Sequence, residues 1–240
     1  MSNIQQNEFE YISRNLRGIR DRIKNAAEAA GRDPDEITLL AAVKYASTKE
    51  VLYLQNVEGV NVLGENRVQQ LLEKYDGLNK ENMSLHFIGS LQTNKVKYIV
   101  DKVDCIHSLD SEKLAAEIDR QCKKIGKVMN VLCEVNCGRE ESKGGVLPED
   151  VEAFCLSLSK YSNIKLCGFM TMAPKCENYD EYLKYFSETA HLVLDIWHKK
   201  LDNIYSPILS MGMSESFEAA IASGSTIVRV GRSLFVKDEK

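Results

Sequence analysis

The sequence lacks any apolar run long enough to cross a membrane. The run at residues 37–43 is short and is interrupted by Thr38, whereas a spanning helix needs about 20 apolar residues. The first eight residues contain neither a basic segment nor an apolar one, so they do not resemble a secretory signal. The formal net charge of −4 disfavours the basic surface that nucleic-acid binding requires. We therefore expect a cytoplasmic protein with no membrane and no nucleic-acid partner.

Signatures of disulfides and metals are also missing. The seven cysteines form no CxxC pair, and several lie inside apolar runs. We expect free, mostly buried thiols in a reducing compartment, with a redox-sensitive surface thiol as the alternative. No HExxH sequence occurs, and the four histidines show no metal-ligand spacing and no cluster with cysteine. We therefore expect no metal site.

Proline is scarce, with four residues, and no stretch rich in proline and serine separates two parts of the chain. The hydrophobic share of 44% and the charged share of 28% are ordinary for a globular protein. A chain of 240 residues is long enough to bury a sizeable core. We expect residues 1–240 to form a single domain.

The sequence does contain an alternation of short apolar runs and amphipathic stretches. The apolar runs predict strands at 37–45, 60–64, 85–89, 105–108, 129–136, 165–172, 204–210 and 226–230. The amphipathic stretches predict helices at 8–30, 49–55, 67–74, 94–100, 112–124, 149–158, 179–199 and 215–222. Eight strands alternating with helices, after one extra N-terminal helix, predict an α/β fold of the (β/α)₈ TIM-barrel type. A doubly wound sheet is the alternative, because the pattern does not reveal whether the sheet closes.

A barrel would bring the polar residues at the carboxyl ends of its strands to one mouth. His86 stands at the beginning of its strand, so we expect a structural role for it rather than acid–base chemistry. The residues predicted at the mouth are Lys44, Glu65, Asn66, His86 or Ser90, Ser108, Asn136, Met170, Thr171, Ser210 and Arg229.

Two features at the ends of strand-like runs suggest the chemistry of this mouth. An ammonium group such as that of Lys44 is costly at the end of a buried strand unless it is paired or neutral. Desolvation would make its amine able to form a Schiff base with an aldehyde, whereas the alternative is a lysine that reaches out to a carboxylate. Turns with glycine and serine at 210–214 and 231–233 follow two other runs, as is typical of phosphate binding. An aldehyde for the amine and a phosphate for the turns together suggest pyridoxal 5′-phosphate.

Arg229 lies two residues before Gly231. An arginine stays protonated in proteins, so a guanidinium facing the pyridine nitrogen of the cofactor would keep that nitrogen unprotonated. Such a ring is a poor electron sink. The alternative is an arginine that pairs with a carboxylate inside the barrel. The charged, glycine-containing segment 138–145 predicts either a solvated loop or a lid over the mouth.

An ordered set of motifs gives these residues a family context. The motifs are Ala42-Val43-Lys44, Gly64-Glu65-Asn66 with Val68-Gln69, His86-Phe87-Ile88-Gly89 with Leu91-Gln92 and Asn94-Lys95, Met211-Gly212-Met213-Ser214, Phe217-Glu218, and Val228-Arg229-Val230-Gly231. With them the chain resembles the pyridoxal phosphate homeostasis proteins, single-domain relatives of the N-terminal barrel of alanine racemase. The resemblance covers about residues 8–236.

The resemblance implies a role for each candidate site residue. It implies that Lys44 forms the internal aldimine with pyridoxal 5′-phosphate. It implies that Ser214 holds the phosphate with the backbone of Gly231 and Arg232, and that Arg229 faces the ring nitrogen. It places Asn66 beside the ring and makes Met211 and Met213 walls of the site. The family often has serine where this chain has Val43, and threonine where it has Arg232, so a side-chain phosphate contact would come from Ser233 or from the Arg232 guanidinium.

Racemisation of an amino acid needs two bases, one on each face of the cofactor adduct. In racemases of this barrel type a second domain of the partner subunit provides the second base, and the resemblance leaves no segment for such a domain. Only Tyr45 or His107 could replace it. We therefore expect a monomer that buffers pyridoxal 5′-phosphate or delivers it to apo-enzymes, without strong turnover. The alternatives are a low-activity amino-acid racemase and a phosphate-binding barrel with no pyridoxal chemistry.

Overall fold

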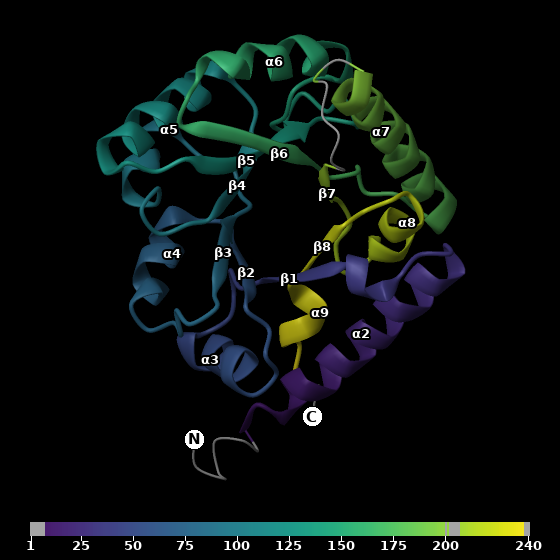
Figure 1. The fold of residues 1–240 in the computed structure, drawn as a ribbon. Helices are drawn as coiled ribbons and strands as arrows, with labels where there is room; N and C mark the ends of the chain where they lie inside the picture. The colour runs from purple at the N-terminus through teal and green to yellow at the C-terminus, as the bar shows by residue number, and fades with distance from the viewer. Residues whose placement is uncertain (1–7, 200, 202–206, 238–240) are drawn as a thin grey trace.

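The computed structural model describes residues 8–199, 201 and 207–237. Eight parallel strands form a closed barrel in chain order (Figure 1). Strand β8 closes onto β1, with Leu40 opposite Arg229. The strands are β1 (Thr38–Ala42), β2 (Val62–Glu65), β3 (Ser84–Phe87), β4 (Cys105–Leu109), β5 (Met129–Val135), β6 (Ile164–Thr171), β7 (Ile208–Ser210) and β8 (Ile227–Val230). The predicted TIM barrel is confirmed, and the doubly wound alternative is wrong.

Helices surround the barrel in Figure 1. They are α2 (Glu10–Ala29), α3 (Thr48–Asn56), α4 (Val68–Tyr75), α5 (Glu112–Ile125), α6 (Val151–Ser157), α7 (Tyr179–Lys199), α8 (Phe217–Ala222) and α9 (Arg232–Phe235), with 3₁₀ helices η1 (Pro34–Glu36), η2 (Thr93–Tyr98), η3 (Pro148–Asp150) and η4 (Leu158–Lys160). None of the helices in the described ranges is long and apolar enough to span a bilayer.

All eight predicted strands are present, although 204–206 of the predicted run 204–210 lie outside the described residues. Several helical elements differ from the prediction: η1 was not predicted, and the helix predicted at 149–158 is α6 with η3 and η4 at its two ends. The helix predicted at 94–100 is the 3₁₀ helix η2, where Val96 is the one buried residue, so no apolar stripe favours a longer α-helix. Helix α9 was not predicted, because four residues are too few to show a helical period.

The additional N-terminal helix α2 packs on the outside of the barrel. Its apolar residues recur every three or four positions and form one buried stripe, which consists of Ile12, Leu16, Ile19, Ile23 and Ala27. This stripe contacts α8 and α9, the two helices that flank β8 in the chain. Helix α2 therefore supports the part of the barrel wall next to the turns that follow β7 and β8.

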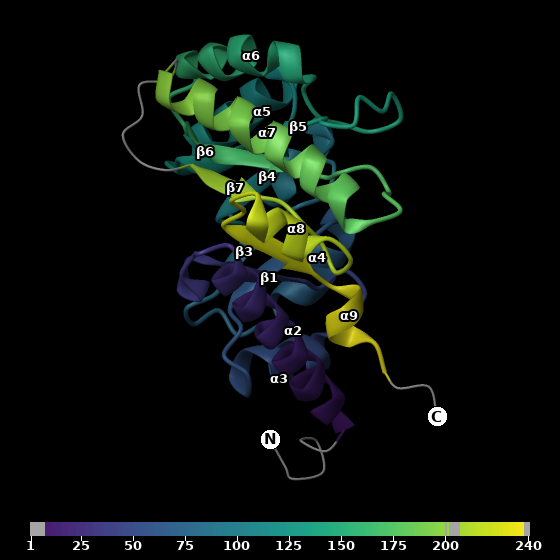
Figure 2. The same cartoon turned by 90° about the vertical axis from the view of Figure 1, so that its right-hand side faces the viewer.

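Side chains of β1 alternate between the two faces of the barrel wall. Leu40 packs inside the barrel with Ile88 and Ile227, whereas Ala41 and Val43 join the core between the wall and the helices. Lys44 is the second residue after β1, in the turn at the carboxyl end of this strand. Figure 2 shows α9 and the segment between β5 and α6 projecting from the same end of the barrel.

Candidate functional site

A buried ion pair holds the segment that carries Lys44. The Lys74 Nζ donates to the Val43 carbonyl oxygen at 2.6 Å and to the Glu65 carboxylate at 2.7 Å. The second carboxylate oxygen of Glu65 accepts the backbone N–H of Asn66 at 2.7 Å. Glu65 is only 1% exposed. Lys74 and Glu65 therefore tie the residue before Lys44 to the backbone of Asn66.

Lys44 is half-buried at the second position after β1. Its Nζ lies 4.8 Å from the ring centroid of Tyr45, which is 77% exposed. Within the described ranges its ammonium forms no ion pair with a carboxylate, so the alternative of a lysine reaching out to an acid is not seen.

Two turns meet beside the strand that carries Lys44. A Cβ atom on Gly231 would lie 2.8 Å from the Ala42 carbonyl oxygen, so the missing side chain lets the turn after β8 approach β1 closely. The Ser233 hydroxyl donates to the Ser214 hydroxyl at 3.1 Å. The first N–H groups of α9 have no intrahelical acceptor. Hydroxyl groups and free amides are thus gathered next to the end of β1, as a phosphate requires.

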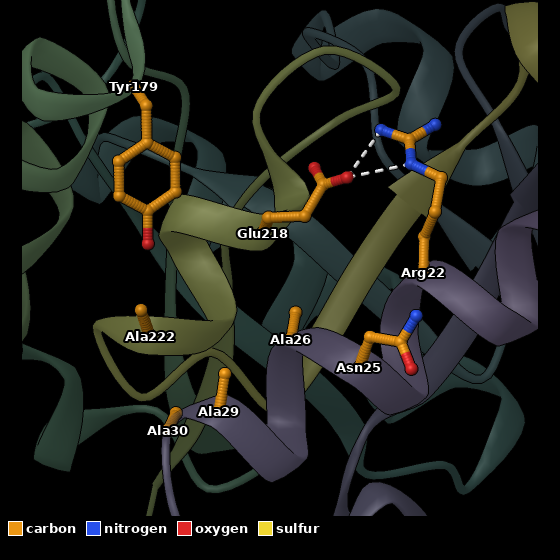
Figure 3. Close-up of a pocket in the computed structure, with 8 residues that line it drawn as sticks. All are labelled: Arg22, Asn25, Ala26, Ala29, Ala30, Tyr179, Glu218 and Ala222. Atoms are coloured by element: carbon orange, nitrogen blue, oxygen red, sulfur yellow. Dashed lines mark hydrogen bonds and ion pairs between the residues drawn. The ribbon is translucent and has the colours of Figure 1, made fainter.

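The turn that carries Ser214 is braced from two directions. Gly212 has a φ of +88°, and a Cβ there would lie 2.7 Å from the Phe217 Cα, so glycine is required. The Arg22 guanidinium of α2 donates to the Ser214 carbonyl oxygen at 3.3 Å and pairs with Glu218 at 2.6 Å. Figure 3 shows this pair at the edge of a cavity of about 380 Å³ between α2 and α8. Because its two charges are paired and it lies outside the barrel, we assign it no ligand.

Met211, Met213 and Arg232 were all predicted to belong to the site, but they differ in their exposure to solvent. Met211 is 1% exposed and lies in the core, whereas Met213 is 43% exposed. Met213 faces outward because its backbone N–H and C=O bond to Ser216 in a tight turn. The Arg232 guanidinium is turned into solvent and pairs with Glu215 at 3.0 Å. Two side-chain contacts to the phosphate were predicted as alternatives, and the Ser233 hydroxyl is the one that lies beside Ser214. The backbone of Arg232 lies in the first turn of α9.

Arg229 is buried at the ends of three strands. Its Nη1 donates to the backbone and side-chain oxygens of Ser210, at 2.6 and 2.7 Å, and its Nη2 donates to the Thr171 carbonyl oxygen at 2.9 Å. Burial lowers the pKa of Arg229 to about 10, so the side chain is a cation at neutral pH. No carboxylate of the described residues hydrogen-bonds to it, and these bonds use three of its five N–H donors.

A histidine pair lies next to Arg229 inside the barrel. His86 Nδ1 and His107 Nε2 are 2.7 Å apart, and their other ring nitrogens bond to the hydroxyls of Ser84 and Ser210. Burial lowers the pKa of His86 to about 4 and that of His107 well below its usual value. These bonds agree with the expected structural role of His86, although it is the third of the four residues of β3 and does not stand at the beginning of the strand as predicted. Contrary to the expectation of no cysteine–histidine cluster, the fold forms such a group here, with the Cys105 sulfur within 4.8 Å of both ligand nitrogens; β3 supplies His86, and β4 supplies Cys105 and His107.

Four of the seven cysteines are buried and three are partly exposed, in agreement with the expectation of mostly buried thiols. Burial raises the pKa of the Cys105 and Cys122 thiols. Thiols that stay protonated are poor nucleophiles. Cys105 and Cys122 therefore contribute packing rather than a reactive thiolate.

Glu134 on β5 is buried beside Asp110 and under the loop 138–145. Burial, and then the charge of Asp110, raise the pKa of Glu134 to about 7, while Arg229 opposes this shift. A Cβ on Gly144 would lie 3.2 Å from the Asp110 carboxylate, so the loop passes close to this pair. Asn136 fixes the loop by donating to two of its carbonyl oxygens, at 3.0 and 3.4 Å. The base of the loop is therefore bonded to the barrel.

Glu134→Gln should change the pH dependence of stability. Between pH 4.5 and 7 folded Glu134 keeps a proton that the unfolded chain has released, so its contribution to the free energy of unfolding falls as pH rises. A pKa shift of this size corresponds to about 3 kcal/mol in the free energy of unfolding, and this contribution is lost by pH 8. In urea titrations, the free energy of unfolding of the variant relative to that of wild type should therefore rise by about this much from pH 5 to pH 8. The exposed Glu141→Gln variant serves as the control, and a pH-independent difference for Glu134→Gln would contradict the prediction.

Comparison with known proteins shows to which family this chain belongs. A sequence profile of the alanine racemase N-terminal domain matches residues 14–238. The chain is 43% identical over 229 residues to the pyridoxal phosphate homeostasis protein of Aquifex aeolicus, with 95% of this chain and 97% of that protein covered. PipY of Synechococcus elongatus with PLP bound has a TM-score of 0.77 at 27% identity, with 90% and 100% of the two chains covered. An alanine racemase of Clostridium difficile shares the fold, with a TM-score of 0.74 at 18% identity over 96% of this chain and 58% of that one. The chain therefore belongs to the family of pyridoxal phosphate homeostasis proteins, built on the N-terminal domain of alanine racemase.

Proposed function

We propose that this chain binds pyridoxal 5′-phosphate at the barrel mouth and buffers or delivers it, without strong catalytic turnover. The observation that carries the proposal is the close approach of Gly231 to Ala42, which sets a cradle of hydroxyls and amides beside the lysine-bearing strand end. When bound, the cofactor supplies an aldehyde for the amine and a phosphate for the cradle. The homeostasis proteins at high identity, and PipY with PLP bound, support the same ligand.

The residues present fit this cofactor in chemistry. Lys44 would hold the aldehyde carbon through Nζ, while Ser214, Ser233 and the backbone of Gly231 and Arg232 would hold the phosphate. Arg229 would turn its remaining N–H donors to the ring nitrogen. Met211 would form a wall from the core side, and Met213 would contribute from the solvent side.

Two orphaned polar atoms support the fit. The Oδ1 of Asn66 and the Oγ of Ser108 are buried without a hydrogen-bond partner among the described residues. Leaving such an atom unsatisfied costs about 1–3 kcal/mol. Asn66 follows β2 and Ser108 lies on β4, so both belong to strands that open into the mouth. A ligand hydroxyl that donates to Asn66 would remove part of this cost.

The surroundings of Lys44 favour binding over turnover. His107 is fully buried and both of its ring nitrogens are bonded, so it is not available as a base on the opposite face of a ligand. Tyr45 is exposed and remains the one candidate of the two. A cationic Arg229 at the ring nitrogen would further weaken carbanion chemistry. A low-activity racemase that uses Tyr45 is the second candidate function.

The experiment that separates the two functions measures turnover and delivery with the same loaded protein. We expect transfer of the cofactor to an apo-enzyme that depends on pyridoxal 5′-phosphate, together with negligible racemisation of alanine and serine. Racemisation that is robust, and is lost in both Lys44→Ala and Tyr45→Phe, would establish the racemase instead. Loaded protein that never activates the apo-enzyme would contradict delivery.

We also propose that the protein acts as a monomer, because its own residues already offer an amine, phosphate contacts and a cation for the ring nitrogen. Light scattering of the loaded protein should give the mass of a single chain of 27.1 kDa. A stable dimer that dissociates when the cofactor is removed would contradict this proposal.

Ser214→Ala should weaken retention of the cofactor without preventing its attachment to Lys44. A hydrogen bond to a charged group contributes about 1.5–3 kcal/mol, so the dissociation constant should rise about tenfold or more. Equilibrium dialysis against pyridoxal 5′-phosphate measures this change. Ser159→Ala, at an exposed position on η4, is the matched control. Equal retention by the two variants would count against the phosphate assignment.

A further inference from the structure

A second polar cavity lies on the other side of Lys44 from the phosphate cradle. It has a volume of about 530 Å³ and is lined by residues of the segments where β2 leads into α4 and β3 leads into η2. Neighbouring strands follow the order β7, β8, β1, β2, β3 around the barrel. The cradle follows β7 and β8, whereas this cavity follows β2 and β3, so the two flank the strand that carries Lys44.

The charged residues that line this cavity are both cations, Arg67 and Lys95, and no aspartate or glutamate lines it. Neither side chain forms an ion pair with a carboxylate in the part of the chain that the structure describes. Two acids contact the lining: Glu73 accepts a hydrogen bond from Gln69 at 2.9 Å, and Glu65, already paired with Lys74, accepts the backbone N–H groups of Asn66 and Arg67. Unpaired like charges in a concave site raise the local concentration of ions of opposite sign. In a chain of net charge −4, this local positive charge indicates selectivity for an anion.

The rest of the lining combines hydrogen-bonding groups with an apolar side. Ser90 and Gln92 add neutral donors, and Leu72, Phe87 and Tyr98 add apolar surface. The volume lies within the range of small-molecule sites, about 300–1,000 Å³. This combination suits an organic molecule that has one anionic group and one apolar part, rather than an inorganic ion alone.

The cavity depends on two turns that meet closely. A Cβ atom on Gly89 would collide with the backbone of Asn66, so glycine allows the turn after β3 to pack on the turn after β2. Asn66 is the one residue of the cofactor assignment that also lines this cavity. Its buried Oδ1 has no partner among the described residues. The two sites are therefore adjacent and share Asn66, while the charged side chains of each site are its own.

We propose that this cavity is a second ligand site, which binds a small organic anion carrying a phosphate or a carboxylate. Arg67 and Lys95 hold the anionic group, and Leu72 and Phe87 contact the apolar part. The site is independent of the phosphate cradle, so its ligand binds while pyridoxal 5′-phosphate occupies the mouth.

Calorimetric titration with phenyl phosphate and with benzoate tests this site. The protein is first loaded with pyridoxal 5′-phosphate and reduced with borohydride, so that the cradle is filled. We expect one further site, with an affinity at least about tenfold lower in Arg67→Gln/Lys95→Gln. The control Arg17→Gln/Lys123→Gln makes the same charge change at exposed positions outside the cavity and should bind as wild type does. The two probes show whether phosphate or carboxylate is preferred.

Absence of binding to wild type, or equal binding by the cavity and control variants, would overturn the proposal. The test does not require the cofactor to bind. If no reducible adduct forms, the proposed function fails, and the same titrations on untreated protein still decide whether Arg67 and Lys95 hold an anion. Binding that Ser214→Ala weakens and the cavity variant does not would assign the probe to the cradle and also overturn the proposal.

Discussion

Lys44→Ala is expected to abolish covalent attachment of pyridoxal 5′-phosphate. Wild-type protein with the cofactor should show a visible absorption band, and borohydride should leave a pyridoxyl group on the peptide that contains Lys44. The variant should lose the band and fall from about one adduct per chain to less than about a tenth, because the other amine near the end of β1, that of Lys74, is held as an ammonium by Glu65 and the Val43 carbonyl. Weak binding anchored by the phosphate should remain, since Ser214 and Ser233 are unchanged.

Lys49→Ala is the matched control, since this exposed lysine lies five positions further along the chain. It should keep the band and the modified peptide at wild-type levels. A full adduct on another lysine in the Lys44→Ala variant would contradict the assignment of the reactive amine. Wild-type protein that stays colourless with added pyridoxal 5′-phosphate would remove the cofactor itself, and the turns after β7 and β8 would then have to bind some other phosphate.

The fold could be predicted because the alternation of apolar and amphipathic segments is local and repeated. The same reasoning predicts a site of Lys44, Asn66, Ser210 and Arg229, and the structure places all four at or near the carboxyl ends of strands of the closed barrel. It also left the Ser233 hydroxyl and the Arg232 guanidinium as alternative side-chain contacts to the phosphate. That choice depends on the pairing of the Arg232 guanidinium with Glu215, which no sequence period encodes.

Other features could not be predicted, because they depend on contacts between segments that are far apart in the sequence. The group of His86, Cys105 and His107 is assembled from neighbouring strands whose spacing resembles no ligand motif. Lys74 has no distinguishing sequence context, yet it reaches the barrel wall. The nearest signal was Glu65, an acidic residue at the end of an apolar run, which requires a partner when it is buried.

Lys74→Met is expected to destabilise the protein and to weaken cofactor retention together. Removal of one partner from a buried ion pair costs about 3–5 kcal/mol, because the other charge remains buried. The side chain of Glu65 is only 2% exposed. In the variant it would still accept the backbone N–H of Asn66 at 2.7 Å, but it would lose the ammonium group of Lys74. Urea unfolding measures the loss. The exposed Lys80→Met variant should change by less than about 1 kcal/mol, since its pairing with Asp76 at 3.8 Å is a surface contact.

Glu65→Gln/Lys74→Met separates the two effects. The neutral amide leaves no unpaired buried charge, so the double variant should recover much of the stability that Lys74→Met loses. The Val43 carbonyl still lacks the Lys74 donor at 2.6 Å, so cofactor retention should stay below wild type. Recovery of stability without recovery of retention would identify Lys74 as a positioning residue for Lys44. If Lys74→Met matched Lys80→Met in stability, or if the double variant retained the cofactor as wild type does, the ion pair would have no positioning role.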